Sequence, residues 1–176
     1  MGMPAATPIH VNRAPVLTLW AAVVAERLGH PPDTALSLAS AVAGTAARAK
    51  ARRLGIAEDR EMAKDQGPTM PMNTARLLGK EVRLTHDADG VVLADAGDGT
   101  PAPAAPVAAY IARAFGSRLA ETREAMVALA ARHAPQELNR IGFRLYEGFR
   151  PEVPEGVQGW GAKGVLRIER IRDATA

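Results

Sequence analysis

The stretch RAPVLTLWAAVVAERLG, residues 13–29, decides the fold class. As a helix, it would carry large apolar side chains around most of its circumference: Val16, Leu17, Leu19, Trp20, Val23, Val24 and Leu28. A helix that is apolar nearly all round is buried in a core or in an interface. Asn12 stands at the cap position, Pro15 is tolerated in the first turn, and Gly29 is a normal stop. We therefore predict a central buried helix over residues 13–28.

The rest of the chain predicts a mainly α-helical domain with a small β-hairpin inserted after the first helices. Further helices are expected at 32–54, 106–115, 117–133 and 135–149, about five in all, with a short one at 73–78. The hairpin is expected near 81–95, where Asp89 and Gly90 supply the turn. The expected organisation is an N-terminal arm over 1–12, a single helical domain over 13–172 and, within that domain, a Gly/Pro-rich tail loop over 150–164.

Composition excludes several classes of protein. The 176 residues include no cysteine, which removes disulfide scaffolds, cysteine nucleophiles and thiolate metal sites. No apolar run reaches the roughly 18 residues of a membrane span, and residues 1–11 lack the features of a secretory signal. We expect a cytoplasmic protein that does not partner with membranes.

Charge is distributed unevenly, although the net charge is only +3. Residues 1–53 carry six bases against two acids, 54–100 five against nine, and 101–176 eleven against eight. Four of the bases crowd the end of the helix predicted at 32–54: Arg48, Lys50, Arg52 and Arg53. They could contact the phosphates of a nucleic acid, or they could simply form a solvated helix end that complements the helix dipole. No recognisable DNA-reading signature accompanies them.

The loop GVQGWGAKG, residues 156–164, is a second candidate site. Its glycines allow a backbone nest for an anion, Lys163 would add charge, and Trp160 could stack on a ring. The stretch is not a phosphate loop, because no Ser or Thr follows the lysine. The alternative is that Trp160 packs against the helical core and so holds the tail on it.

Motifs for catalysis or metal binding are absent from the sequence. Asp87, Asp89, Asp95 and Asp98 lack the spacing of a calcium loop, and the four histidines, His10, His30, His86 and His133, form no zinc pattern. No GxSxG turn occurs. We therefore assign no catalytic residue, metal or cofactor, and expect a binding protein rather than an enzyme. The alternative of an active site that the fold assembles from residues distant in the sequence remains.

Two stretches resemble a family of small uncharacterised bacterial proteins with no established function. They are RAPVLTLWAAVVAERLG with the following AVAG and ARAKARRLGI, and FRPEVPEGVQGWGAKG near the end, covering roughly 11–55 and 140–172. The resemblance implies a bacterial source and a tail that belongs to the domain. It implies no activity.

Three functions remain as expectations from the sequence. The first is a non-enzymatic binding protein, associated with nucleic acid through the basic helix end. The second is a small-molecule-binding protein or enzyme that uses the Trp160 and Lys163 loop. The third is a structural or partner-binding subunit, because the surplus apolar surface of helix 13–28 and the small residues Ser40, Gly44 and Ala47 suit a homo-oligomer, most simply a homodimer.

Overall fold

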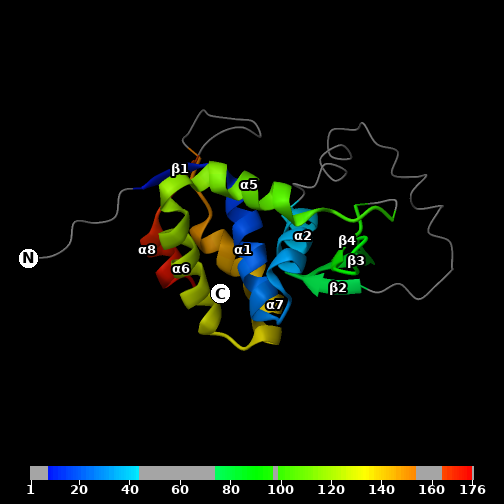
Figure 1. Cartoon of the computed structure of the whole chain (residues 1–176). Coiled ribbons are helices and arrows are strands. Elements are labelled where there is room, and N and C mark those ends of the chain that lie inside the picture. The colour runs from blue at the N-terminus through cyan, green and yellow to red at the C-terminus, as the bar shows by residue number, and fades with distance from the viewer. Residues whose placement is uncertain (1–7, 44–73, 97–98, 154–163, 176) are drawn as a thin grey trace, which may run out of the picture.

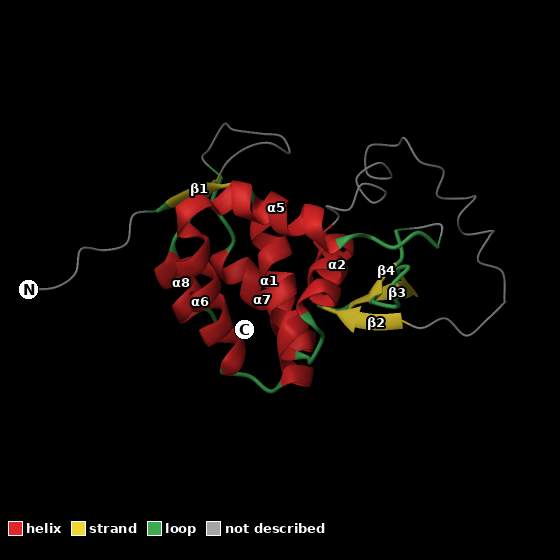
Figure 2. Cartoon of the chain, viewed as in Figure 1, coloured by secondary structure: helices red, strands yellow, loops and turns green. Residues whose placement is uncertain are grey.

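The computed structural model describes residues 8–43, 74–96, 99–153 and 164–175. The chain is α-rich, with two small antiparallel sheets (Figures 1 and 2). Its helices are α1 (Arg13–Arg27), α2 (Pro32–Ala43), α5 (Ala104–Phe115), α6 (Leu119–Ala131), α7 (Pro135–Phe149) and α8 (Ile168–Asp173). Its strands are β1 (Ile9–Val11), β2 (Thr74–Leu77), β3 (Lys80–His86), β4 (Val92–Ala94) and β5 (Gly164–Leu166).

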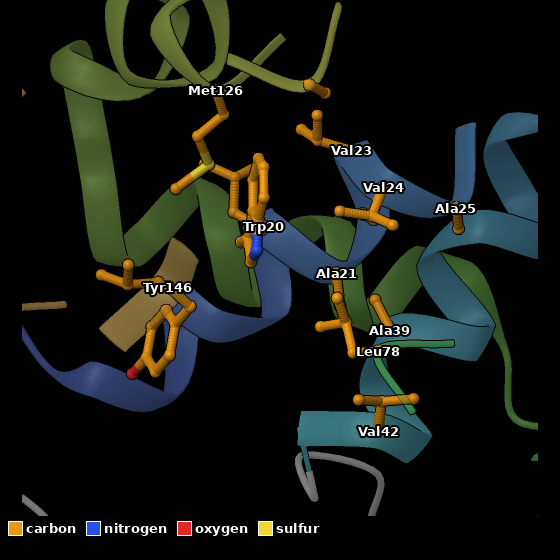
Figure 3. Close-up of a cluster of buried hydrophobic side chains, with 14 of the residues drawn as sticks. Trp20, Ala21, Val23, Val24, Ala25, Ala39, Val42, Leu78, Met126 and Tyr146 are labelled. Carbon is orange, nitrogen blue, oxygen red and sulfur yellow. The ribbon is translucent and has the colours of Figure 1, made fainter. Parts of the chain in front are cut away.

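Helix α1 is the centre of the fold, as its nearly uniform apolar surface predicts. It packs against α2, α5, α6 and α7, and ten of its fifteen residues are buried. Trp20 is fully buried, and its indole Nε1–H donates to the carbonyl of Gly142 at 2.9 Å. The ring meets Phe149 edge to face with centroids 5.4 Å apart. Figure 3 shows Trp20 among the side chains that α1, α2 and α6 contribute to this core.

A three-stranded sheet, in the order β2-β3-β4, lies beside α2 (Figure 2). The predicted hairpin corresponds to β3 and β4, but the short helix expected at 73–78 is wrong, because Thr74–Leu77 forms β2. Ser37 joins the sheet to α2: its Oγ donates to the carbonyl of Ala102 at 2.6 Å and accepts from the backbone N–H of Ala94 at 2.8 Å. The buried hydroxyl therefore satisfies two backbone groups at once.

The tight turn between β2 and β3 is anchored on α7. Its first residue, Leu78, has a φ of +53°, an unusual conformation for a residue with a side chain. The N–H of Leu78 donates to Asn139 Oδ1 at 2.7 Å, and Asn139 Nδ2 donates to the carbonyl of Arg76 at 2.6 Å. The Leu78 side chain is buried where α7 has Gly142, and a Cβ on that glycine would lie 2.4 Å from Leu78 Cδ2. Tertiary contacts thus hold a strained turn in place.

The second sheet pairs the two ends of the described chain. Strand β1 runs antiparallel to β5, with Ile9 opposite Leu166 and Val11 opposite Gly164. Ile9 and Val11 are buried, so the end of the arm predicted over 1–12 is part of the folded core. The last described segment contains β5 followed by α8, which packs on α6 and α7.

Several predicted helices have different boundaries. The helix expected at 32–54 is described as α2 as far as Ala43, and its remainder lies outside the described residues. Helix 135–149 is confirmed as α7. Ser117, expected to begin the next helix upstream, lies instead in a short 3-10 turn (Gly116–Arg118) that precedes α6. No helix in the described ranges has the length and apolar character needed to cross a membrane.

Candidate ligand-binding site

Both sites predicted from the sequence fall outside the described residues. This applies to Arg48, Lys50, Arg52 and Arg53 at the basic helix end, and equally to Trp160 and Lys163 in the tail loop. The residues on either side of the tail loop are described: Glu152 bridges to Val165, and Gly164 pairs with Val11. Strand β5 is thus flanked by Glu152 on one edge and by β1 on the other.

A hollow of about 360 Å³ lies next to this strand pair, where β1 leads into α1 and meets the second half of α5. Its lining consists of His10, Val11, Asn12, Pro15, Tyr110, Arg113 and Ala114. His10 is exposed because the alternation of β1 directs its neighbours Ile9 and Val11 into the core. A hollow of this size falls in the range that small-molecule ligands occupy.

Asn12 lines this hollow and carries a buried polar atom with no partner among the described residues. It occupies the cap position of α1, as predicted, but its side chain makes no capping hydrogen bond. The third helical position is Pro15, which has no N–H, so one of the two usual donors to a cap is missing. Asn12 Oδ1 is consequently buried with no hydrogen-bond partner in the described structure. A buried polar atom of this kind is costly unless something else bonds to it.

The charge around the hollow is positive. Arg113 is exposed and makes no ion pair or hydrogen bond within the described part of the chain, and none of the described residues that line the hollow or form the first turn of α1 is acidic. Arg13 follows Asn12 and donates from Nε to the carbonyl of Pro151 at 2.9 Å. Burial raises the pKa of the nearby Tyr146 to about 12, while the positive charges of Arg13 and Arg150 act in the opposite direction. The start of α1 is therefore surrounded by cations.

The other side chains considered from the sequence form no second site in the described ranges. No group of three or more histidines and acids there could hold a metal ion. Asp87 Oδ1 accepts from the N–H groups of Asp89 and Val91, so it serves the β3–β4 turn. His133 Nδ1 lies 3.6 Å from Glu137 Oε1 in the first turn of α7, and His133 Nε2 is buried without a hydrogen-bond partner in the described structure.

Sequence reasoning considered His10, Asn12 and Tyr110 separately and did not bring them together with Arg113. One signal was present in the sequence: a capping residue followed three positions later by proline loses a donor. The approach of α5 to β1 has no such signal, because it depends on how distant helices pack.

Compared with protein-family models, with curated proteins and with solved structures, the chain matches none. The resemblance to uncharacterised bacterial proteins therefore stays an expectation, and the function has to be argued from the site.

Proposed function

We propose that this protein is a non-enzymatic binding protein that takes a phosphate ester in the hollow between β1, α1 and α5. The observation that carries the proposal is that Arg113 and Asn12 line the same hollow: among the described residues Arg113 has no partner, the buried Asn12 Oδ1 has no hydrogen bond, and no lining residue is acidic. A guanidinium is suited to bidentate contact with a phosphate. The amide oxygen lacks a donor, which a free hydroxyl of a phosphorylated polyol or sugar would supply once the Asn12 side chain turns toward the hollow.

The lining favours a nucleotide among phosphate esters. Tyr110 brings an aromatic ring and His10 an imidazole to the lining, beside the polar Asn12 and Arg113 and the aliphatic Val11, Pro15 and Ala114. Flat rings of this kind stack on nucleobases with little dependence on sequence. The same chemistry is found in a free nucleotide and at the end of a nucleic acid chain, so the proposal includes the nucleic-acid association expected from the charge pattern.

Calorimetric titration with three probes tests the proposal: inorganic phosphate, adenosine monophosphate and a short 5′-phosphorylated single-stranded RNA. Arg113→Gln should weaken binding of the nucleotide by about ten- to a hundredfold, because one charge-assisted contact contributes about 1.5–3 kcal/mol. Asn12→Ala should weaken the nucleotide more than phosphate, since its oxygen receives the hydroxyl. Arg144→Gln is the matched control, because Arg144 is also exposed and lies on α7, away from the hollow.

Equal effects of Arg113→Gln and Arg144→Gln, or no binding of any probe, would contradict the proposal. Tighter binding of the RNA than of the mononucleotide, with the same sensitivity to Arg113→Gln, identifies a nucleic acid end as the source of the phosphate. RNA binding that falls steeply between about 50 and 200 mM salt and responds only to substitution of Arg48, Lys50, Arg52 and Arg53 would place the interface at the basic helix end and remove the hollow from consideration.

A further inference from the structure

Two hollows lie side by side where α2 begins, and both are largely apolar. One, of about 720 Å³, is lined by 30–34 together with Val91 and Val92. The other, of about 340 Å³, extends from Leu36 and Leu93 to the proline-rich entry of α5. They share Asp33 and Val91, so they form one groove, which we call the α2–α5 groove.

Proline and alanine make the walls of this groove. Pro31 and Pro32 lead into α2, while Pro101 and Pro103 lead into α5, and Ala105 and Ala108 continue the wall along α5. Pro31, Pro32, Pro103, Ala105 and Ala108 are exposed. Short, rigid side chains present apolar surface with little conformational entropy to lose when a partner covers it.

Strand addition to β4, the strand of the neighbouring sheet that lines the groove, is not available to a partner. Thr34 Oγ1 donates to the carbonyl of Val92 at 2.7 Å, and Ser37 Oγ accepts from the N–H of Ala94. The carbonyl of Ala94 accepts from the N–H of Ala102 at 2.8 Å. The outer edge of β4 is thus already bonded within the chain, and an occupant has to be held by its side chains.

The charges of the groove are negative. Asp33 and Asp87 both line it, and neither has a cationic partner in the described part of the chain. The other titratable group is His30, whose pKa is lowered by burial, so its imidazole is neutral at neutral pH. A protein of net charge +3 therefore presents, at this point, an apolar groove with two acids that form no ion pair with any described residue.

We propose that the α2–α5 groove docks a peptide segment of another protein, apolar on the side that faces the prolines and alanines and carrying lysine or arginine against Asp33 and Asp87. The charge of the groove and the closed edge of β4 both favour this occupant over a strand or an acidic chain. The site is separate from the phosphate hollow, since the two share no lining residue.

The test selects, from a library of short random peptides, those that bind to the purified full chain. The affinity of the enriched peptides for the protein is then measured by fluorescence polarisation. Ala108→Arg places a bulky charge in the groove, and Ala112→Arg is the matched control, an equally exposed alanine one turn further along α5 that lines none of the three hollows described. Asp33→Asn removes an acid from the groove. Asp89→Asn is its control, because Asp89 lies in the β3–β4 turn and does not line the groove.

The proposal expects enriched peptides that combine apolar residues with lysine or arginine. Their affinity should fall at least tenfold with Ala108→Arg and severalfold with Asp33→Asn, and stay within twofold with Ala112→Arg and Asp89→Asn. Three results overturn it: no enrichment, peptides without a basic residue, or affinities that Ala108→Arg leaves unchanged. Concentration-dependent dimerisation that Ala108→Arg abolishes would also overturn it, because the occupant would then be a second copy of the chain.

Discussion

Replacing Gly142 by alanine tests how the β2–β3 turn is held. In a helix interior this change is worth about 1 kcal/mol in favour of alanine. The new Cβ, however, would lie 2.4 Å from Leu78 Cδ2 and 3.8 Å from Trp20 Nε1. Leu78 is buried, and its backbone is held by Asn139, so the side chain has little room to move. Overpacking of this kind costs about 1–3 kcal/mol, which leaves a net loss of about 1 kcal/mol.

Gly148, which lies on α7 as Gly142 does, provides the control. A Cβ at Gly148 would find its nearest neighbour, Ala174 Cβ, at 4.0 Å, which is ordinary contact. Gly148→Ala should therefore raise the free energy of unfolding, by up to about 1 kcal/mol because the site is near the end of α7. Urea unfolding followed by circular dichroism should separate the two variants by about 2 kcal/mol.

A double-mutant cycle assigns the loss to Leu78. In a Leu78→Gly background the obstructing side chain is gone and the positive φ is relaxed, so Gly142→Ala should stabilise rather than destabilise. If Gly142→Ala and Gly148→Ala stabilise the otherwise unchanged protein equally, the Leu78 side chain moves aside at no cost, and the reasoning about this turn is refuted.

Three further predictions concern stability. Gly164→Ala should destabilise by about 1–3 kcal/mol, since its Cβ would lie 2.6 Å from Pro151 Cβ and 3.0 Å from the Pro151 carbonyl carbon; a melting temperature equal to that of the unchanged protein would contradict this. Ser37→Ala should cost about 1–3 kcal/mol in chemical unfolding, because it leaves buried backbone groups of Ala94 and Ala102 without their partner, whereas a cost near zero would mean that water replaces the hydroxyl. The pKa of Tyr146, raised to about 12 by burial, should make unfolding easier as pH rises from about 10 to 12, because the unfolded tyrosine ionises first. Absorbance titration at alkaline pH should lose its late step in Tyr146→Phe, and loss of a step near pH 10 instead would contradict the assignment.

The sequence predicted an element correctly where the pattern of apolar residues within that segment was sufficient to define it. The apolar stripe of 135–149, bounded by Pro135 and Pro151, predicted α7 with its observed limits. The buried centre of the fold followed in the same way from the all-round apolar surface of 13–28. Both segments carry their own periodicity, so no knowledge of distant partners was needed.

Features that depend on distant partners were missed. Thr74–Leu77 has a weak alternation of its own and becomes β2 because β3 pairs with it and Asn139 of α7 holds the turn. The candidate hollow was missed for a similar reason, because its residues come from β1, the start of α1 and α5. The basic helix end and the tail loop were predicted from local composition alone, and they stay predictions.

The central position of α1 has a consequence for the order in which the protein is made. Some partners of its side chains are synthesised late: Trp20 bonds to a residue 122 positions further along, and Arg13 to one 138 positions further along. During translation α2 can cover one face of α1 soon after both helices emerge, but the face that packs on α6 and α7 stays open until those helices are made. A ribosome-bound nascent chain that stops before α6 should therefore display this face of α1 to chaperones, and extension through α7 should end that exposure.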